Sequence, residues 1–253
     1  MRLQDKVAIV TGGGAGIGQA VARGYAREGA RVIVADINAD EGEATAAGIR
    51  QTGREALFTH IDIAKTADVE RMVATTVARY DRIDVLVNNA AVQLFHQEGR
   101  AHELSEDTWD RTLSVNLRGT WLCCKYTIPV MLQHGGGAII NVSSPTGLTG
   151  CAPGSTAYSS SKGGVFALTR VMAVDYARDN IRVNALVPGT TLTPLTEAVL
   201  GEAAFRADRE ELMPIGRLGQ PEDVVGLAIF LASEEAQFCI GGIFMADGGM
   251  TAK

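Results

Sequence analysis

The sequence predicts an α/β protein with a doubly wound parallel sheet and helices on both faces, in three layers. Short apolar, β-branched runs alternate with longer segments of helical periodicity along the chain. A glycine-rich turn follows the first apolar run, as expected where a strand leads directly into a helix. With 253 residues and 46% hydrophobic content, we expect one domain over residues 1–253.

The first half of the chain is predicted to hold four strands and three helices. Continuous apolar runs indicate strands that are buried on both faces, and they occur at residues 7–10, 31–35, 56–61 and 85–87. The segments between them predict helices at residues 19–28, 40–52 and 66–80. Gly29 and Gly53 follow the first two helices, where a left-handed residue commonly ends a helix.

The second half continues the alternation with longer helices. We expect one or two helices within 105–133, a strand at 138–142, a helix at 158–178, a strand at 182–187, a helix at 221–232 and a last strand at 243–245. Residues 193–213 form the least regular part and predict a helical insertion. We interpret residues from about 190 to 213 as a flap over the site.

Composition excludes several classes of function. The net charge is −6 and no basic run is present, so a nucleic-acid partner is not expected. No apolar run approaches about 18 residues, which argues against a membrane span. The start, MRLQDKVAIVTGGG, lacks a signal peptide pattern, so we expect a cytoplasmic protein. None of the four cysteines has metal-ligand spacing, and no metal is expected.

The turn after the first strand predicts a phosphate site. It has the sequence Thr-Gly-Gly-Gly-Ala-Gly-Ile-Gly and leads directly into a helix. Glycines allow a pyrophosphate to approach the backbone, and the start of the helix offers N–H groups to it. The cofactor residues predicted here are Gly12, Gly14, Gly16, Ile17 and Gly18.

A carboxylate at the end of the second strand predicts the kind of dinucleotide. Asp36 would accept hydrogen bonds from the ribose hydroxyls and repel a 2′-phosphate. No Arg or Lys lies in the glycine loop or directly after Asp36, so NAD is favoured over NADP. Ile37 is expected beside the same ribose, and Asp62 and Ile63, after the third strand, near the adenine.

Tyr158 and Lys162 predict acid–base chemistry. They are four residues apart in a predicted helix, so both side chains lie on one face, about 6 Å apart along its axis. A free tyrosine has a pKa of about 10, and a nearby ammonium favours the phenolate. The pair is therefore expected to exchange a proton near neutral pH, with help from a positively charged oxidised cofactor.

Taken together, these residues resemble the short-chain dehydrogenase/reductase superfamily in its single-domain form, with a Rossmann fold. The resemblance covers essentially the whole chain. Further matching segments are Asn88-Asn89-Ala90-Ala91, with alanine in place of the usual last glycine, Asn116 in SVNLRGT, Ser143-Ser144, Pro188-Gly189 with Thr193, RLGQPEDV at 217–224, and Asp247-Gly248-Gly249.

The resemblance implies a nicotinamide-dependent interconversion of a secondary alcohol and a ketone. Tyr158 would be the general acid or base, Lys162 would lower its pKa and hold the nicotinamide ribose, and Asn116 would orient a relay water. Further implied cofactor contacts are Asn89, Ala90, Pro188, Gly189, Thr191 and Thr193. The family commonly forms homotetramers, which implies a homotetramer here.

The identity of the active serine stays open between two neighbours. The family's serine usually precedes the tyrosine by 13 residues, and that position is Pro145 here. Ser144 is favoured over Ser143, because the family's serine is usually the second of such a pair. The serine that is not active would be a turn-capping hydroxyl.

Substrate selection is expected to depend on loops. Residues proposed to contact substrate are Ser144, Gln93, His96, Cys151 and Leu195. A mixed lining would suit a small cyclic or sugar-like alcohol. The alternatives are a 3-oxoacyl-thioester reductase, which usually takes NADPH, and a catalytically silent nucleotide-sensing protein. Enoyl reduction is disfavoured by the spacing of Tyr158 and Lys162.

Overall fold

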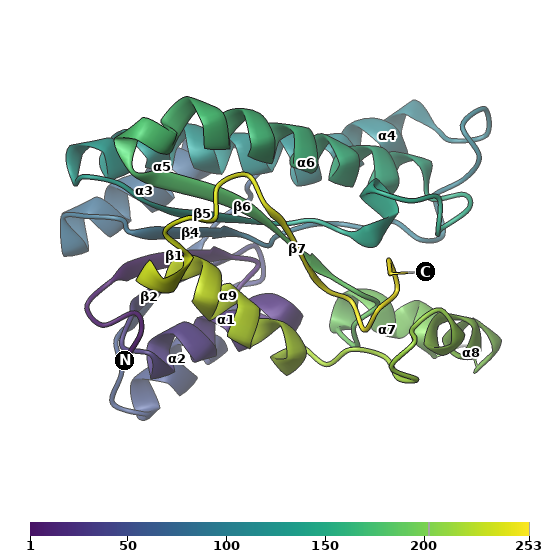
Figure 1. Ribbon diagram of the computed structural model, residues 1–253, viewed down its shortest axis with the longest axis horizontal. Helices are drawn as coiled ribbons and strands as arrows, with labels where there is room; N and C mark the ends of the chain where they lie inside the picture. Colours follow the sequence, from purple (N-terminus) through teal and green to yellow (C-terminus); the bar gives the residue numbers. More distant parts are fainter. Residues whose placement is uncertain (202, 253) are drawn as a thin grey trace.

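Seven parallel strands form one sheet in the computed structural model, which describes residues 1–201 and 203–252 (Figure 1). The strand order is β3-β2-β1-β4-β5-β6-β7. Their bounds are Val7–Thr11, Arg31–Asp36, Ala56–His60, Val85–Asn88, Gly137–Val142, Ile181–Pro188 and Ile243–Ala246, numbered β1 to β7 in chain order. The predicted doubly wound α/β fold is confirmed, and all seven predicted strands are present in the sheet.

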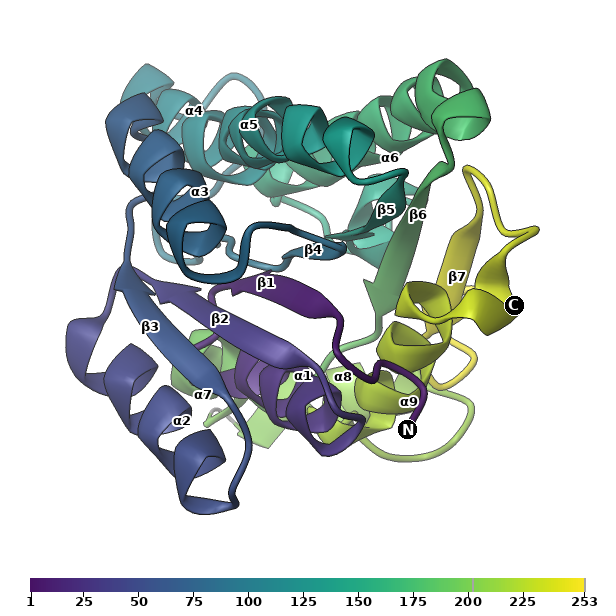
Figure 2. The same ribbon diagram turned by 90° about the vertical axis from the view of Figure 1, so that its left-hand side faces the viewer.

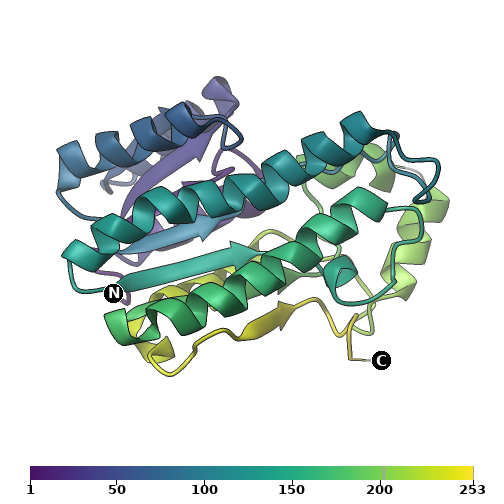
Figure 3. The ribbon, with the colours of Figure 1, turned by 90° about the horizontal axis from the view of Figure 1, so that it is seen from above.

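Helices cover both faces of this sheet (Figures 1 and 2). Their bounds, α1 to α9 in chain order, are Gly16–Arg27, Ala39–Gln51, Thr66–Tyr80, Glu106–Leu113, Thr120–Gln133, Thr156–Tyr176, Pro194–Leu200, Ala203–Glu211 and Glu222–Ala232. Apolar residues of α1, α2 and α9 pack on one face, and residues of α3, α5 and α6 pack on the other. Figure 3 shows α5 and α6 along the outside of the second face.

The central strands are buried on both faces because most of their residues are apolar, as β1 and β4 show. In β1, Ala8 and Val10 face α1, while Val7 and Ile9 face the opposite layer. All four side chains are fully buried. This explains why continuous apolar runs, rather than alternating ones, identified the strands in the sequence.

The structure agrees with the two expected helical segments and adds detail to each. The predicted helical segment 105–133 is two helices joined by a π-helical turn, Ser114–Gly119. Gly119 lies against Ile63, and an added Cβ would come within 2.8 Å of that side chain. The predicted insertion contains α7 and α8, and its position 202 lies outside the described residues.

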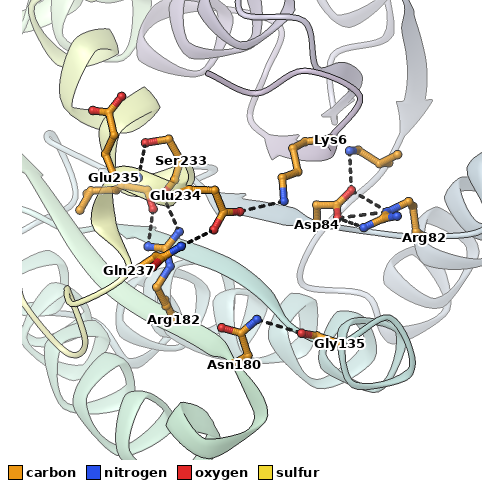
Figure 4. Close-up of polar contacts among 12 residues, drawn as sticks. Lys6, Arg82, Asp84, Gly135, Asn180, Arg182, Ser233, Glu234, Glu235 and Gln237 are labelled. Atoms are coloured by element: carbon orange, nitrogen blue, oxygen red, sulfur yellow. Dashed lines mark hydrogen bonds and ion pairs between the residues drawn. The ribbon is translucent and has the colours of Figure 1, made fainter. Parts of the chain in front are cut away.

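Polar contacts join the elements at the amino ends of the strands (Figure 4). The buried Arg182 of β6 donates to Leu231 O at 2.7 Å and to Ser233 O at 3.0 Å. It thereby satisfies carbonyls at the end of α9 that have no partner within the helix. Asp84, before β4, accepts the Val7 N–H at 2.8 Å and pairs with Arg82. These side chains join the elements at the amino ends of the strands.

Among the described residues, no helix is both long and apolar enough to cross a membrane.

Candidate active site

The glycine loop is positioned by contacts with the turn after β4. The Thr11 hydroxyl accepts the N–H groups of Asn89 and Ala90 at 3.0 and 3.1 Å. The Asn89 side chain donates to the carbonyls of Thr11 and Gly12, both at 3.1 Å. Strands β1 and β4 are neighbours in the sheet, so these contacts hold the two loops together where the strand order reverses. Such a switch point is where ligands bind in open α/β sheets.

The loop requires glycine at its turns. Gly12 and Gly16 have φ values of 63° and 53°, in the left-handed region. An added Cβ on Gly18 would lie 2.0 Å from the Gly12 carbonyl oxygen, so α1 approaches the loop too closely for any side chain. The residue before α1, Ala15, has no side-chain acceptor for the first N–H groups of the helix. The geometry therefore fits the predicted pyrophosphate cradle.

Asp36 holds the far side of this loop. One carboxylate oxygen accepts the Gly14 N–H at 2.8 Å and the other accepts the Asn38 N–H at 2.9 Å. The carboxylate is partly exposed and lines a cavity of about 520 Å³. The Asp36 carboxylate is thus held in place by the loop that would bind the phosphates.

That cavity brings together most of the residues predicted to bind a dinucleotide cofactor. Its described lining includes Gly12, Gly16, Ile17, Asp36, Ile37, Asp62, Ile63, Asn89, Ala90 and Thr193. Gly14 lies beside Gly16 on the wall of a neighbouring cavity. Gly18 lines neither cavity, and it allows α1 to pack closely against the Gly12 carbonyl. Arg111 of α4 also lines the larger cavity, which the sequence reasoning missed.

Tyr158 and Lys162 share the wall of a second cavity, of about 220 Å³. The Lys162 Nζ lies 5.7 Å from the centre of the Tyr158 ring and donates to Val142 O at 3.0 Å. Lys162 is 3% exposed. Burial lowers the pKa of Lys162 to about 8 and raises that of Tyr158 to about 12, against a smaller lowering by a hydrogen bond with Ser144.

Among the protein's own groups, burial thus shifts the pKa of Tyr158 upward, whereas the sequence led us to expect a lowering by Lys162 together with an oxidised cofactor. Lys162 is buried and Tyr158 is partly buried, and this burial penalises the charged form of each. The raised pKa keeps the Tyr158 phenol neutral, and the lowered pKa makes Lys162 easier to deprotonate. A lower tyrosine pKa must come from charge that is added to the site.

The two candidate serines have different surroundings. Ser143 Oγ donates to Lys162 O at 2.9 Å, inside the backbone of α6. Ser144 Oγ accepts from the N–H and the hydroxyl of Thr146, at 3.3 and 3.1 Å. Because both acceptor positions of Ser144 are used, its own hydrogen is directed to another acceptor, and Tyr158 is a hydrogen-bond partner.

Asn116 lies in the π-helical turn between α4 and α5 and is 1% exposed. Its Oδ1 accepts the Val92 N–H at 2.8 Å, and its Nδ2 donates to Val92 O at 2.9 Å and to Ser161 Oγ at 3.1 Å. Both amide hydrogens are therefore used. A water could bind Asn116 only at an oxygen, which limits how it would take part in a relay.

The cavity beside Tyr158 includes some of the predicted substrate residues and not others. Its wall contains Gln93, Leu195 and Ser144, together with Pro188, Gly189, Thr191 and Thr193 from the predicted nicotinamide loop. His96 is exposed, and neither His96 nor Cys151 is on that wall. The two residues after Cys151 in the same loop, Ala152 and Pro153, line the wall instead.

The sequence reasoning missed Glu98, which caps the helix that carries Tyr158. Its carboxylate accepts the N–H groups of Ala157 at 3.1 Å and Tyr158 at 2.9 Å. Ser155, the residue at the cap position, makes no side-chain cap bond. A cap donated from a loop about 60 residues upstream leaves no local sequence signal.

Arg209 and Met250 are further wall residues that were missed. They come from α8 and from the turn after β7. Nothing in the sequence near either residue indicates that it approaches Tyr158.

Known proteins match essentially the whole chain. The family described as "Enoyl-(Acyl carrier protein) reductase" matches residues 12–251. An uncharacterized oxidoreductase, YxbG, of Bacillus subtilis (strain 168) is 43% identical over 99% of this chain and 93% of its own length. A cyclopentanol dehydrogenase of Comamonas sp. (strain NCIMB 9872) is 40% identical over 100% of this chain and 99% of its own.

Solved structures also match nearly the whole chain. Levodione reductase has a TM-score of 0.92 and 33% identity, covering 99% of each chain. A structure from Beutenbergia cavernae has a TM-score of 0.93 and 36% identity, covering 99% of this chain and 98% of its own, and contains NADP at low occupancy. The resemblance expected from the motifs is therefore confirmed.

We predict that Lys162→Met makes the folded protein more stable at pH 7. The lysine pKa falls from 10.5 to about 8 on folding, so the folded state binds fewer protons between these values and the lysine destabilises it below pH 8. After loss of the bond to Val142 O, the net gain should be about 2 kcal/mol in the free energy of unfolding. Urea denaturation at pH 7 and at pH 10 measures it, and the gain should shrink at pH 10.

The exposed Lys65 provides a matched control. Lys65→Met should change the free energy of unfolding by less than about 0.5 kcal/mol. A Lys162→Met protein less stable than the wild type at pH 7 would contradict the buried-charge account.

Proposed function

Because the chain belongs to the short-chain dehydrogenase/reductase family, we propose that it is an NAD(H)-dependent oxidoreductase that interconverts a small secondary alcohol and a ketone. The observation that carries this proposal is one cavity wall that holds Tyr158, Ser144 and Lys162 next to the cradle for a dinucleotide. Relatives named for cyclic alcohols support a compact cyclic or sugar-like substrate.

The reaction divides between cofactor and protein. The nicotinamide, when bound, supplies or accepts the hydride. Tyr158 gives its proton to the ketone oxygen during reduction and removes it from the alcohol during oxidation. When substrate binds, the single hydrogen of Ser144 would turn from Tyr158 to the substrate oxygen, since the acceptor positions of Ser144 are already taken by Thr146.

Lys162 links the proton exchange to the cofactor. Its Nζ has three donors, of which one is used by Val142 O, and the remaining two point to a role with the nicotinamide ribose and a relay water. The positive charge of an oxidised nicotinamide would favour the phenolate and offset the burial that raises the tyrosine pKa. Asn116 would hold the relay water at an oxygen.

We also propose a cytoplasmic homotetramer. Its support is the set of exposed apolar side chains Val171 and Val174 on α6 and Phe238 and Met245 near or in β7. Exposed apolar groups gathered on regular elements are typical of surfaces that bind other subunits.

We expect Tyr158→Phe to lower kcat by about 10³-fold with cyclopentanol or cyclohexanol and NAD, because only the proton donor is lost. NADH binding, measured by fluorescence titration, should change by less than about threefold. In the wild type, alcohol oxidation should rise with pH as the phenol ionises. The panel should also contain a 3-oxoacyl and an enoyl thioester. Turnover of a thioester alone would favour those activities, and binding of NADH without any turnover would favour a sensor.

The two serines should separate in a paired experiment. Ser144→Ala should lower kcat by about 10²-fold with little change in the melting temperature, because it removes a donor to the substrate oxygen. Ser143→Ala should lower the free energy of unfolding by about 1 kcal/mol, because it removes the bond to Lys162 O, and leave kcat nearly unchanged. The reverse pattern would transfer the active role to Ser143.

Asp36→Asn tests the choice of cofactor. The amide keeps one oxygen for the Gly14 N–H but loses the charge that repels a 2′-phosphate. The ratio of kcat/KM for NAD to that for NADP should fall by about 10- to 100-fold. An unchanged ratio, measured with one alcohol at saturation, would remove Asp36 from the ribose site.

A further inference from the structure

We propose that Glu98 is a positioning residue for the proposed reaction, because it holds the backbone of Tyr158 against a loop that forms part of the substrate cavity. The inference rests on the proposed function, since Tyr158 is positioned for the proton transfer assigned to it there. Glu98 is absent from the described lining of that cavity, so it acts through Tyr158 and not on the substrate.

The Glu98 carboxylate binds two successive N–H groups in the first turn of α6. Its Oε2 accepts from Ala157 at 3.1 Å, and its Oε1 accepts from Tyr158 at 2.9 Å. The hydroxyl of Thr156, the first residue of the helix, donates to Gly99 O at 2.7 Å. Three successive residues of α6 are therefore joined to two successive residues of one loop.

Within α6 itself, the structure describes no side chain that caps these N–H groups. Ser155 occupies the cap position without a side-chain cap bond, and the first turn contains no acidic residue. N–H groups in the first turn of a helix have no partner inside the helix, and a carboxylate is favourable there. Removal of the Glu98 carboxylate would therefore free the residue that carries the reacting phenol.

The other end of the same loop is also joined to the backbone of Tyr158. The Asn116 amide makes two hydrogen bonds with the backbone of Val92 and donates to Ser161 Oγ at 3.1 Å. Ser161 Oγ in turn donates to Tyr158 O at 2.7 Å. Residues 92–99 are thus linked to the carbonyl of Tyr158 at one end and to its N–H at the other.

Between these two attachments the loop contributes to the substrate wall. Gln93 and Phe95 line the cavity together with Tyr158. Because the loop is attached to the tyrosine backbone at both ends, the attachments fix the position of this wall relative to the phenol. Proton transfer needs a heavy-atom distance of about 3 Å, and a misplacement of about 1 Å can lower the rate about 100-fold.

The test replaces Glu98 with glutamine and with alanine. Glu98→Gln keeps one accepting oxygen, and Glu98→Ala removes both. With cyclopentanol and NAD, kcat should fall about 10-fold in Glu98→Gln and about 100-fold in Glu98→Ala. KM for NAD and the dissociation constant of NADH should stay within about twofold of the wild type, since Glu98 is absent from the described lining of both cavities.

Ser105→Ala is the matched control, because Ser105 caps α4 directly after the same loop. Its Oγ accepts the Thr108 N–H at 3.2 Å, and the residue is exposed and absent from the described cavity wall. Ser105→Ala and Glu98→Ala each remove a cap and should lower the melting temperature by about 2–4 °C. The control should leave kcat unchanged.

A kcat of Glu98→Ala within about twofold of the wild type would overturn the proposal and make Glu98 a helix cap alone. An equal loss of kcat in Ser105→Ala would also overturn it. If Glu98→Ala does not fold, Glu98→Gln carries the same comparison, because it retains an acceptor for one N–H group.

Hydrogen exchange separates this proposal from the proposed function. Measured by mass spectrometry on the full chain, exchange in the first turn of α6 and in residues 92–99 should be about 10-fold faster in Glu98→Gln than in the wild type, and unchanged in that turn in Ser105→Ala. If the wild type oxidises no alcohol while this joint change is present, the function fails and the attachment of the loop to Tyr158 stands. If alcohols are oxidised and the Glu98 variants match the wild type in exchange and kcat, the positioning role fails and the function stands.

Discussion

The parallel arrangement of the strands is the constraint on which this structure depends. Because every strand runs in the same direction, the carboxyl ends of β1, β4, β5 and β6 meet at one edge of the sheet. The glycine loop, the Asn89 turn, the serine pair and the Pro188 loop each follow one of these ends. Segments from four distant parts of the chain thereby meet at the carboxyl ends of the strands. No sequence pattern near any one segment indicates which other segments it will contact.

Burial at the carboxyl ends of the strands makes it costly to charge Tyr158 and Lys162. The sheet and α6 bury Lys162 and partly bury Tyr158, and each then resists becoming charged. The protein uses few groups to relieve this, namely a backbone carbonyl for Lys162 and a serine hydroxyl for Tyr158. A positive charge bound beside Tyr158 would therefore favour its phenolate.

The two ends of the site are built differently. The dinucleotide side is rigid, because close backbone approaches and paired hydrogen bonds fix Gly12, Gly18 and Asn89. The substrate side is assembled from loops and from the two helices of the flap, which contact it through side chains. Side chains on the loops and flap can therefore vary in this architecture without disturbing the glycine loop.

Local pattern in the sequence was enough to predict the sheet, the helices, the glycine loop, Asp36 and the spacing of Tyr158 and Lys162, because each of these depends on neighbouring residues and on backbone sterics. Only the tertiary structure decided four features: the helix cap by Glu98, the position of Arg209 on the cavity wall, the π-helical turn around Asn116 and the position of His96 off that wall. The direction of the tyrosine pKa shift belongs to the same group. Helix spacing set the distance between two side chains, but burial by remote segments set the cost of charging them, and no local pattern in the sequence encodes that cost.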